Sequence, residues 1–243
     1  MNQTSKPKQN GFFITGTDTD CGKTYVASSL IAHLAKHFQA QGGRVVGLKP
    51  IASGFELHDG QWLNNDVEAI KAASTVALPD DLRNRYSYKE PIAPHIAANM
   101  AGGKIDIGAI SNDVDAAYSY ADIVVVEGVG GWLVPLDQAS NSSIKSLAEE
   151  LALPVILVVG LRLGCLNHAL LAIESIRKSN VNFLGWIANH VDPEYQYLDE
   201  NIQTLKNSID EPMLFELTYS LEPKEVVALK GVNTVLYSVL SIP

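Results

Sequence analysis

The sequence is poor in cysteine, aromatic residues and basic residues. Its two cysteines, Cys21 and Cys165, can form no disulfide framework and lack the spacing of a metal site, so we expect a reducing compartment. The 18 Lys and Arg residues are outnumbered by 27 Asp and Glu residues, and no basic cluster offsets the net charge of −9. This balance argues against a nucleic-acid partner, and it means that an anionic substrate has to be held by local donors.

Long apolar runs are absent as well. The longest, Leu151–Leu161, contains Pro154 and is too short to span a bilayer. Residues 1–10 form a polar tail that lacks the apolar stretch of a signal peptide. We therefore expect a cytoplasmic protein with no membrane partner, in which residues 11–243 form one domain.

What the chain has in quantity is Val, Ile, Leu and Ala, in short apolar runs that alternate with helical patterns. The predicted strands are Phe12–Thr15, Arg44–Pro50, Ile123–Glu127, Val155–Val159, Phe183–Asn189 and a shorter one near Met213–Leu217. The predicted helices are Thr24–Gln41, Asp66–Ala73, Ile107–Ser119, Ile144–Leu151, Leu166–Lys178 and Leu198–Ser208. This alternation predicts an α/β fold, with a mostly parallel sheet and helices on both of its faces.

The most specific motif lies between the first predicted strand and the first predicted helix. There Gly16 and a loop rich in Thr and Asp lead into Gly22-Lys23-Thr24. A strand, such a loop and a helix opened by Gly-Lys-Thr together predict a phosphate-binding loop, in which backbone N–H groups and Lys23 face phosphates and the Thr24 hydroxyl holds Mg²⁺. The first glycine is unusual, because the common spacing would put it at Thr17. The motif predicts a single-domain P-loop NTPase-like fold that binds ATP.

Ligands of open parallel sheets bind at the carboxyl ends of the strands, so the residues that follow each strand matter most. Lys49 and Ser53 follow the second strand; a lysine there either extends to solvent or serves as a site cation, and its place at the sheet edge favours the site. Glu127 follows the third strand, where an ATPase places the acid that holds Mg²⁺. The glycines after it, Gly128 and Gly130 among them, let backbone N–H groups approach a ligand.

Three further positions stay open on local grounds. Asp66 is either a helix N-cap or a second acidic Mg²⁺ ligand. Asn189 either reads the edge of adenine or forms a turn. The turn before Cys165 opens a helix whose N–H groups suit a carboxylate or a phosphate. The stretch Ser53–Pro94 is the least regular of the chain, with dense Gly, Asn, Asp and Pro.

Taken together, these blocks resemble dethiobiotin synthetases, the ATP-dependent ring-closing enzymes of biotin synthesis. The matching segments, in chain order, are Gly16–Thr24, Lys49–Gly54, Glu127–Trp132, Gly164–Ala169 and Ala188–Asn189. The interval from Gly16 to Gly22, odd for a general phosphate loop, is the form found in this family. The chain departs from the family's usual pattern at Arg162, at Val129 and in the segment 217–219.

The resemblance implies a ligase that takes ATP as co-substrate, 7,8-diaminopelargonate, CO₂ or bicarbonate, and Mg²⁺. One amine would capture CO₂ as a carbamate, the carbamate oxygen would attack the γ-phosphate, and the second amine would close the ureido ring and release phosphate. The family also implies a homodimer in which the substrate site lies at the subunit interface.

Residue roles carry over by the same resemblance. Lys49 and Lys23 would be catalytic, and Thr24, Asp66 and Glu127 would hold Mg²⁺. The nucleotide would contact Asp20, Cys21, Gly22, Lys23, Thr24, Tyr25, Glu127, Gly128, Val129, Gly130, Asn189, His190, Thr218, Tyr219 and Ser220. The diamine or its carbamate would contact Thr19, Lys49, Ser53, Val129, Gly130 and, at its carboxylate, Cys165, Leu166 and Asn167.

Two other classes of protein compete with this interpretation. A partition-type or septum-positioning ATPase switch has a similar fold but carries a further lysine at the start of the loop, where this chain has Asp18. A glutamine-dependent amidotransferase of the cobyric-acid type needs a glutaminase domain, for which 243 residues leave little room.

Overall fold

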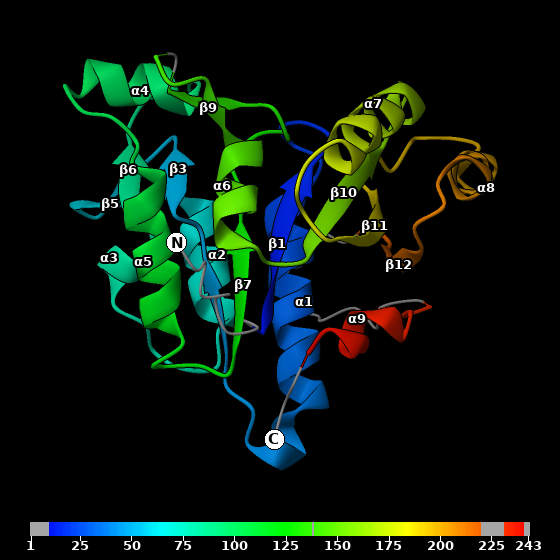
Figure 1. Cartoon of the computed structure of the whole chain (residues 1–243), viewed down its shortest axis with the longest axis horizontal. Coiled ribbons are helices and arrows are strands. Elements are labelled where there is room, and N and C mark those ends of the chain that lie inside the picture. Colours follow the sequence, from blue (N-terminus) through cyan, green and yellow to red (C-terminus); the bar gives the residue numbers. More distant parts are fainter. Residues whose placement is uncertain (1–9, 138, 220–230, 241–243) are drawn as a thin grey trace, which may run out of the picture.

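The structure, a computed structural model, describes residues 10–137, 139–219 and 231–240 (Figure 1). Most of the predicted polar tail and the predicted nucleotide contact Ser220 therefore lie outside the described residues. Within those three ranges, no helix is both long enough and apolar enough to cross a membrane.

The centre of the molecule is a sheet of six strands, each parallel to its neighbours, in the spatial order β12-β11-β10-β1-β7-β2. The strands are β1 Gly11–Gly16, β2 Val45–Leu48, β7 Ile123–Glu127, β10 Val155–Leu161, β11 Phe183–His190 and β12 Met213–Leu217. Residues of β1, β2, β7 and β10 are buried throughout, because helices cover both faces. The carboxyl ends of β1 and β10 point toward the upper edge of Figure 1.

Two apolar clusters fill the space between the sheet and its helices. One face packs against α1 Lys23–His37, α2 Asn65–Ala73 and the short α9 Val235–Ser238. The other packs against α5 Ile107–Ala117, α6 Ile144–Leu151, α7 Cys165–Arg177 and α8 Leu198–Ser208. Side chains of a single strand alternate between the two clusters, as Phe12 and Phe13 do. The predicted fold class is therefore confirmed. Every predicted strand and helix is present; β7, β12, α6 and α8 have the predicted ends, and the other elements have shifted ends.

Strand β2 stops at Leu48, although the apolar run predicted a strand to Pro50. The reason is that the Lys49 N–H donates to the Arg83 carbonyl at 2.9 Å, and the Lys49 carbonyl accepts from Asn84 Nδ2 at 2.6 Å. The backbone thus leaves the sheet at Lys49. The predicted first helix is also too long, because α1 ends at His37 and a short 3₁₀ turn, Gln39–Gln41, follows it.

The irregular stretch Ser53–Pro94 holds short elements that periodicity does not reveal. They are β3 Ile51–Ser53 paired with β6 Tyr86–Tyr88, the hairpin β4 Glu56–His58 and β5 Gln61–Leu63, and the helices α3 Asp80–Arg83 and α4 Pro94–Met100. The hairpin turn is Asp59-Gly60, both with positive φ, a known two-residue turn signal that was missed. A further small ladder joins β8 Pro135–Asp137 to β9 Ser142–Ser143.

Among the described residues that follow β12, α9 is a short helix of four residues. Leu236 is fully buried in the cluster beneath α1. Tyr237 accompanies it, with its hydroxyl 2.5 Å from His33 Nε2 and its ring stacked on His37. The chain end thus closes one face of the sheet against α1.

The loop between β1 and α1 lies directly on β10. A Cβ atom added at Gly160 would stand 2.8 Å from the Cα atom of Cys21 and 3.0 Å from its Cβ atom. Such distances are too short for real side chains, so the strand needs a glycine where the loop crosses it.

We expect Gly160→Ala to destabilise the protein by about 1–3 kcal/mol and to weaken ATP binding, because the added methyl group pushes the Cys21 backbone away from β10. Denaturant unfolding and calorimetric titration with ATP measure the two effects. Gly103→Ala is the control, since a Cβ there meets no atom within 4 Å. Equal behaviour of the two variants would contradict the proposed packing of the loop.

Candidate active site

The loop from Gly16 to Lys23 brings a lysine back over its own backbone. Lys23, the first residue of α1, donates from Nζ to the Asp18 carbonyl at 2.7 Å, and its side chain is almost fully buried. Gly22 begins the helix with φ 84°, and a Cβ there would overlap the Asn189 amide. Because Gly22 has no side chain to cap α1, the N–H groups of the first turn face the loop. The predicted phosphate-binding geometry is formed.

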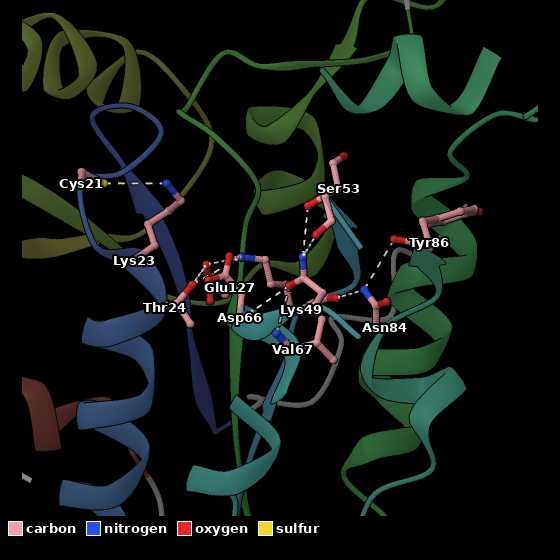
Figure 2. Close-up of polar contacts among 12 residues, drawn as sticks. Cys21, Lys23, Thr24, Lys49, Ser53, Asp66, Val67, Asn84, Tyr86 and Glu127 are labelled. Carbon is pink, nitrogen blue, oxygen red and sulfur yellow. Dashed lines mark hydrogen bonds and ion pairs between the residues drawn. The ribbon is translucent and has the colours of Figure 1, made fainter. Parts of the chain in front are cut away.

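A second lysine lies among three oxygen-bearing side chains (Figure 2). Lys49 Nζ, just past β2, is 2.7 Å from Glu127 Oε1 at the end of β7 and 3.4 Å from Thr24 Oγ1, and it also donates to Asp66 Oδ2 in α2. Thr24 Oγ1 in turn donates to Glu127 Oε1 at 2.8 Å. Residues far apart in sequence therefore meet around one ammonium group, and all four were predicted site residues.

Burial and charge act in opposite directions on this cluster. Burial by itself lowers the pKa of Lys49, but the adjacent charges of Glu127 and Asp66 outweigh it, so the pKa lies above its usual value. Burial by itself raises the pKa of Asp66, and the Lys49 charge outweighs that effect, so the pKa lies below its usual value. Lys49 and Asp66 thus both carry charge at neutral pH.

The same oxygen atoms are suited to a hard divalent cation. Among the described residues no group of three or more His, Cys, Asp or Glu side chains could hold a metal, so a cation here would need the Thr24 hydroxyl beside Asp66 and Glu127. Glu127 Oε2 is buried and has no hydrogen-bond partner in the described part of the chain. A carboxylate oxygen in that condition fits a ligand to Mg²⁺, which prefers oxygen donors.

The structure decides between the two readings of Asp66. The N-cap of α2 is Asn64, whose Oδ1 accepts from the N–H groups of Asp66 at 3.1 Å and Val67 at 3.2 Å. The reading of Asp66 as an N-cap is therefore wrong, and its carboxylate faces Lys49. The signal for the true cap was present, since Asn is a strong N-cap residue and stands two places earlier.

One cavity of about 620 Å³ joins these groups. Its walls include most of the predicted loop and substrate contacts, namely Thr19, Asp20, Gly22, Lys23, Thr24, Tyr25, Lys49, Ser53, Asp66, Glu127, Val129 and Gly130. The Ser53 hydroxyl is buried and, within the described ranges, unpaired. The rest of the wall is apolar and comes from Pro91–Pro94 and Val134, which were not predicted because no polar motif marks them.

Two residues that were predicted to contact the nucleotide lie outside the cavity wall. Cys21 is fully buried beneath the loop, against β10. The Gly128 N–H donates to the Ile14 carbonyl at 2.9 Å, so it extends the sheet. Neither residue is part of the cavity wall.

Four of the residues predicted to bind the nucleotide lie at or just past the carboxyl ends of β11 and β12, and they do not line this cavity. Asn189 is only 2% exposed and donates from Nδ2 to the Cys21 carbonyl at 2.9 Å, while its Oδ1 is buried without a partner among the residues described. His190 Nε2 lies 2.9 Å from Glu216. Thr218 and Tyr219 follow the end of β12. The contact of these four residues with the nucleotide stays a prediction, and the Asn189 side chain also holds the phosphate-binding loop through the Cys21 carbonyl.

The predicted carboxylate contacts Cys165, Leu166 and Asn167 begin α7 after Gly164, which has φ 95°. They do not line the cavity of their own chain. A separate groove of about 560 Å³ runs between α7 and the segment 131–135, with Leu171 and Leu133 at its walls. Both leucines are exposed, as is Leu163 before α7. No sequence pattern predicted this apolar surface.

The start of α7 is also tied to the phosphate-binding loop. Arg162 donates from Nη2 to the Asp18 carboxylate and, at 3.3 Å, to the Thr19 carbonyl. Asp18 therefore has a structural partner at the place where a switch ATPase carries its further lysine.

Known proteins resemble the chain in sequence and in fold. A family described as an AAA domain matches residues 10–222. The ATP-dependent dethiobiotin synthetase BioD of Aromatoleum aromaticum is 43% identical over 219 residues, which cover 89% of this chain and 95% of that enzyme.

Among solved structures, the cell division protein FtsY of Thermotoga maritima has a TM-score of 0.53 at 16% identity and covers 100% of this chain and 74% of its own. The signal recognition particle receptor FtsY of Elizabethkingia anophelis, in complex with GDP, has a TM-score of 0.51 at 14% identity, with 100% and 67% covered. At such low identity the likeness shows the fold alone, which is that of the P-loop NTPases. Because the sequence match to BioD extends over nearly the whole of both chains, this protein belongs to the dethiobiotin synthetase family.

Proposed function

We propose that the chain closes the ureido ring of dethiobiotin from 7,8-diaminopelargonate, CO₂ and ATP. The observation that carries this proposal is the Lys49 ammonium, held between Glu127 and Asp66 in the same cavity as the Lys23 loop. A phosphate-binding loop alone accounts for a nucleotide. A second buried cation beside it accounts for an anionic reaction partner of the γ-phosphate.

The reaction places distinct demands on the two ends of the cavity. One amine adds to CO₂ and loses a proton to give a carbamate, whose oxygen then displaces ADP from the γ-phosphorus. The second amine attacks the resulting mixed anhydride, the ring closes, and phosphate leaves. Lys23 and the loop N–H groups stabilise the transferring phosphoryl group, and Lys49 neutralises the carbamate and its developing charge.

The substrate side of the cavity offers matching groups. The buried Ser53 hydroxyl and Thr19 provide hydrogen bonds, together with the backbone at Val129 and Gly130. The apolar wall of Pro91–Pro94 suits the hydrocarbon chain of the diamine. Mg²⁺ would be held by Thr24, Asp66 and Glu127, where it neutralises phosphate charge when bound.

We also propose a homodimer in a cytoplasmic, reducing compartment. The exposed Leu133 and Leu171 line the groove beside α7, and Leu163, just before α7, is exposed as well; exposed apolar side chains of this kind favour association. A partner subunit covering this surface can direct its Cys165–Asn167 N–H groups at the substrate carboxylate. Cys21 and Cys165 are both buried free thiols, which agrees with a reducing compartment.

Phosphate release from ATP should require both the diamine and bicarbonate, because the carbamate is the nucleophile. A coupled phosphate assay with each component omitted in turn measures this. Phosphate release that ignores the diamine would refute the synthetase reaction for this chain.

Lys49→Ala should lower turnover by about 10²-fold while the KM for ATP stays within a few-fold, since the lost charge faces the carbamate and not the loop. Initial rates at varied ATP concentration, normalised to the amount of folded protein, measure kcat and the KM for ATP separately. Lys71→Ala is the matched control, because Lys71 is an exposed lysine paired with Asp80 on the far side of α2 from the cavity. Loss of ATP binding in Lys49→Ala would show that Lys49 contacts the nucleotide, which contradicts its proposed role at the carbamate.

Leu171→Glu should yield a monomer with weakened diamine binding and unchanged ATP binding, because a buried charge opposes association. Sedimentation and calorimetric titration measure these properties. Leu57→Glu serves as the control, since both leucines are 59% exposed and Leu57 lies on the β4–β5 hairpin. Unchanged diamine affinity in a demonstrated monomer would rule out the shared site.

A further inference from the structure

The Asn64 side chain joins two parts of the cavity wall. Its Nδ2 donates to the Ser53 carbonyl at 3.1 Å and to the Gly54 carbonyl at 3.3 Å. Its Oδ1 accepts from the N–H groups of Asp66 at 3.1 Å and Val67 at 3.2 Å. A carboxamide has two donor hydrogens and two acceptor lone pairs, so every one is used inside the molecule. The dashed lines that reach Ser53 and Val67 in Figure 2 belong to this set.

The two parts carry different chemistry. Ser53 ends β3 and lines the cavity, and its hydroxyl is buried and unpaired among the described residues. Asp66 lies in the first turn of α2 and faces Lys49. Between them the chain leaves the cavity as the exposed β4–β5 hairpin. Without the Asn64 hydrogen bonds at the base of this hairpin, Ser53 and Asp66 could move independently.

We infer that Asn64 is a positioning residue, which sets the Ser53 hydroxyl at a fixed place relative to the Asp66 carboxylate. The inference rests on the proposed function, in which Ser53 contacts the diamine or its carbamate and Asp66 belongs to the Mg²⁺ end. Asn64 is buried, with 7% exposure, so it acts through these two residues and does not touch substrate through the open cavity.

The substitution Asn64→Ser tests the acceptor and the donor functions of the carboxamide separately. Serine is a good N-cap, so the bonds to the first turn of α2 are retained in part, whereas its short side chain cannot also donate to the Ser53 and Gly54 carbonyls. The KM for the diamine should rise about tenfold, because a small misplacement of a contact group is costly. The KM for MgATP should stay within about threefold, since α2 keeps its cap.

Backbone amide exchange gives a readout that does not depend on the reaction. The Phe55 N–H, which donates to the Tyr88 carbonyl at 3.2 Å next to the lost tie, should exchange at least about tenfold faster in Asn64→Ser. The Asp66 and Val67 amides should change much less. Asp106→Ser is the control, because Asp106 caps α5 in the same way, accepting from Gly108 and Ala109 away from the cavity.

Unchanged Phe55 exchange, or equal increases in both KM values, would overturn the positioning role. The wild-type chain is assayed in parallel with the diamine added and omitted. If it shows no diamine-dependent phosphate release, the proposed function fails, and the exchange data alone then decide whether Asn64 ties Ser53 to α2.

Discussion

The buried ion pair between Lys49 and Glu127 is the interaction on which the carboxyl edge of the sheet depends. The Glu127 side chain is wholly buried, and a carboxylate in such a place is costly unless a cation and hydrogen bonds satisfy it. Lys49 and Thr24 do so from neighbouring elements, and Asp66 extends the pair into α2. The ends of β2 and β7 and the starts of α1 and α2 are thereby held in one arrangement.

This arrangement explains how an acidic protein can bind an anionic nucleotide. With a net charge of −9, the molecule has no general field to attract phosphates, so we expect their binding to depend on Lys23 and the α1 N–H groups at short range. Thr24, Asp66 and Glu127 serve both Lys49 and the proposed Mg²⁺. The ammonium and the proposed metal would therefore share these three side chains, which would link the nucleotide end of the cavity to its substrate end.

Local sequence patterns predicted the fold where apolar residues form a continuous run or recur with the period of a helix. The run Ile123–Glu127 and the four-residue repeat of Val26, Leu30 and Leu34 correspond to β7 and to the buried face of α1. Such patterns fail where short elements depend on their neighbours. The β3–β6 pair spans about three residues on each side, too few for periodicity, and β2 ends early because Arg83 and Asn84 capture the Lys49 backbone.

The chemical type of the site could be predicted from the sequence, because Glu127 ends a buried strand, Lys49 follows another, and Gly22-Lys23-Thr24 follows the loop after a third. Parallel strands end at one edge of the sheet. The side chains that contact those residues could not be predicted from the sequence. Whether Asp66 caps a helix or faces a cation depends on Asn64, and the apolar wall at Pro91–Pro94 depends on how the irregular stretch folds back over the cavity. Residue types and their spacing carry the chemistry, whereas contacts between distant segments arise only when the chain packs, since each side chain then takes the partner that burial leaves within reach.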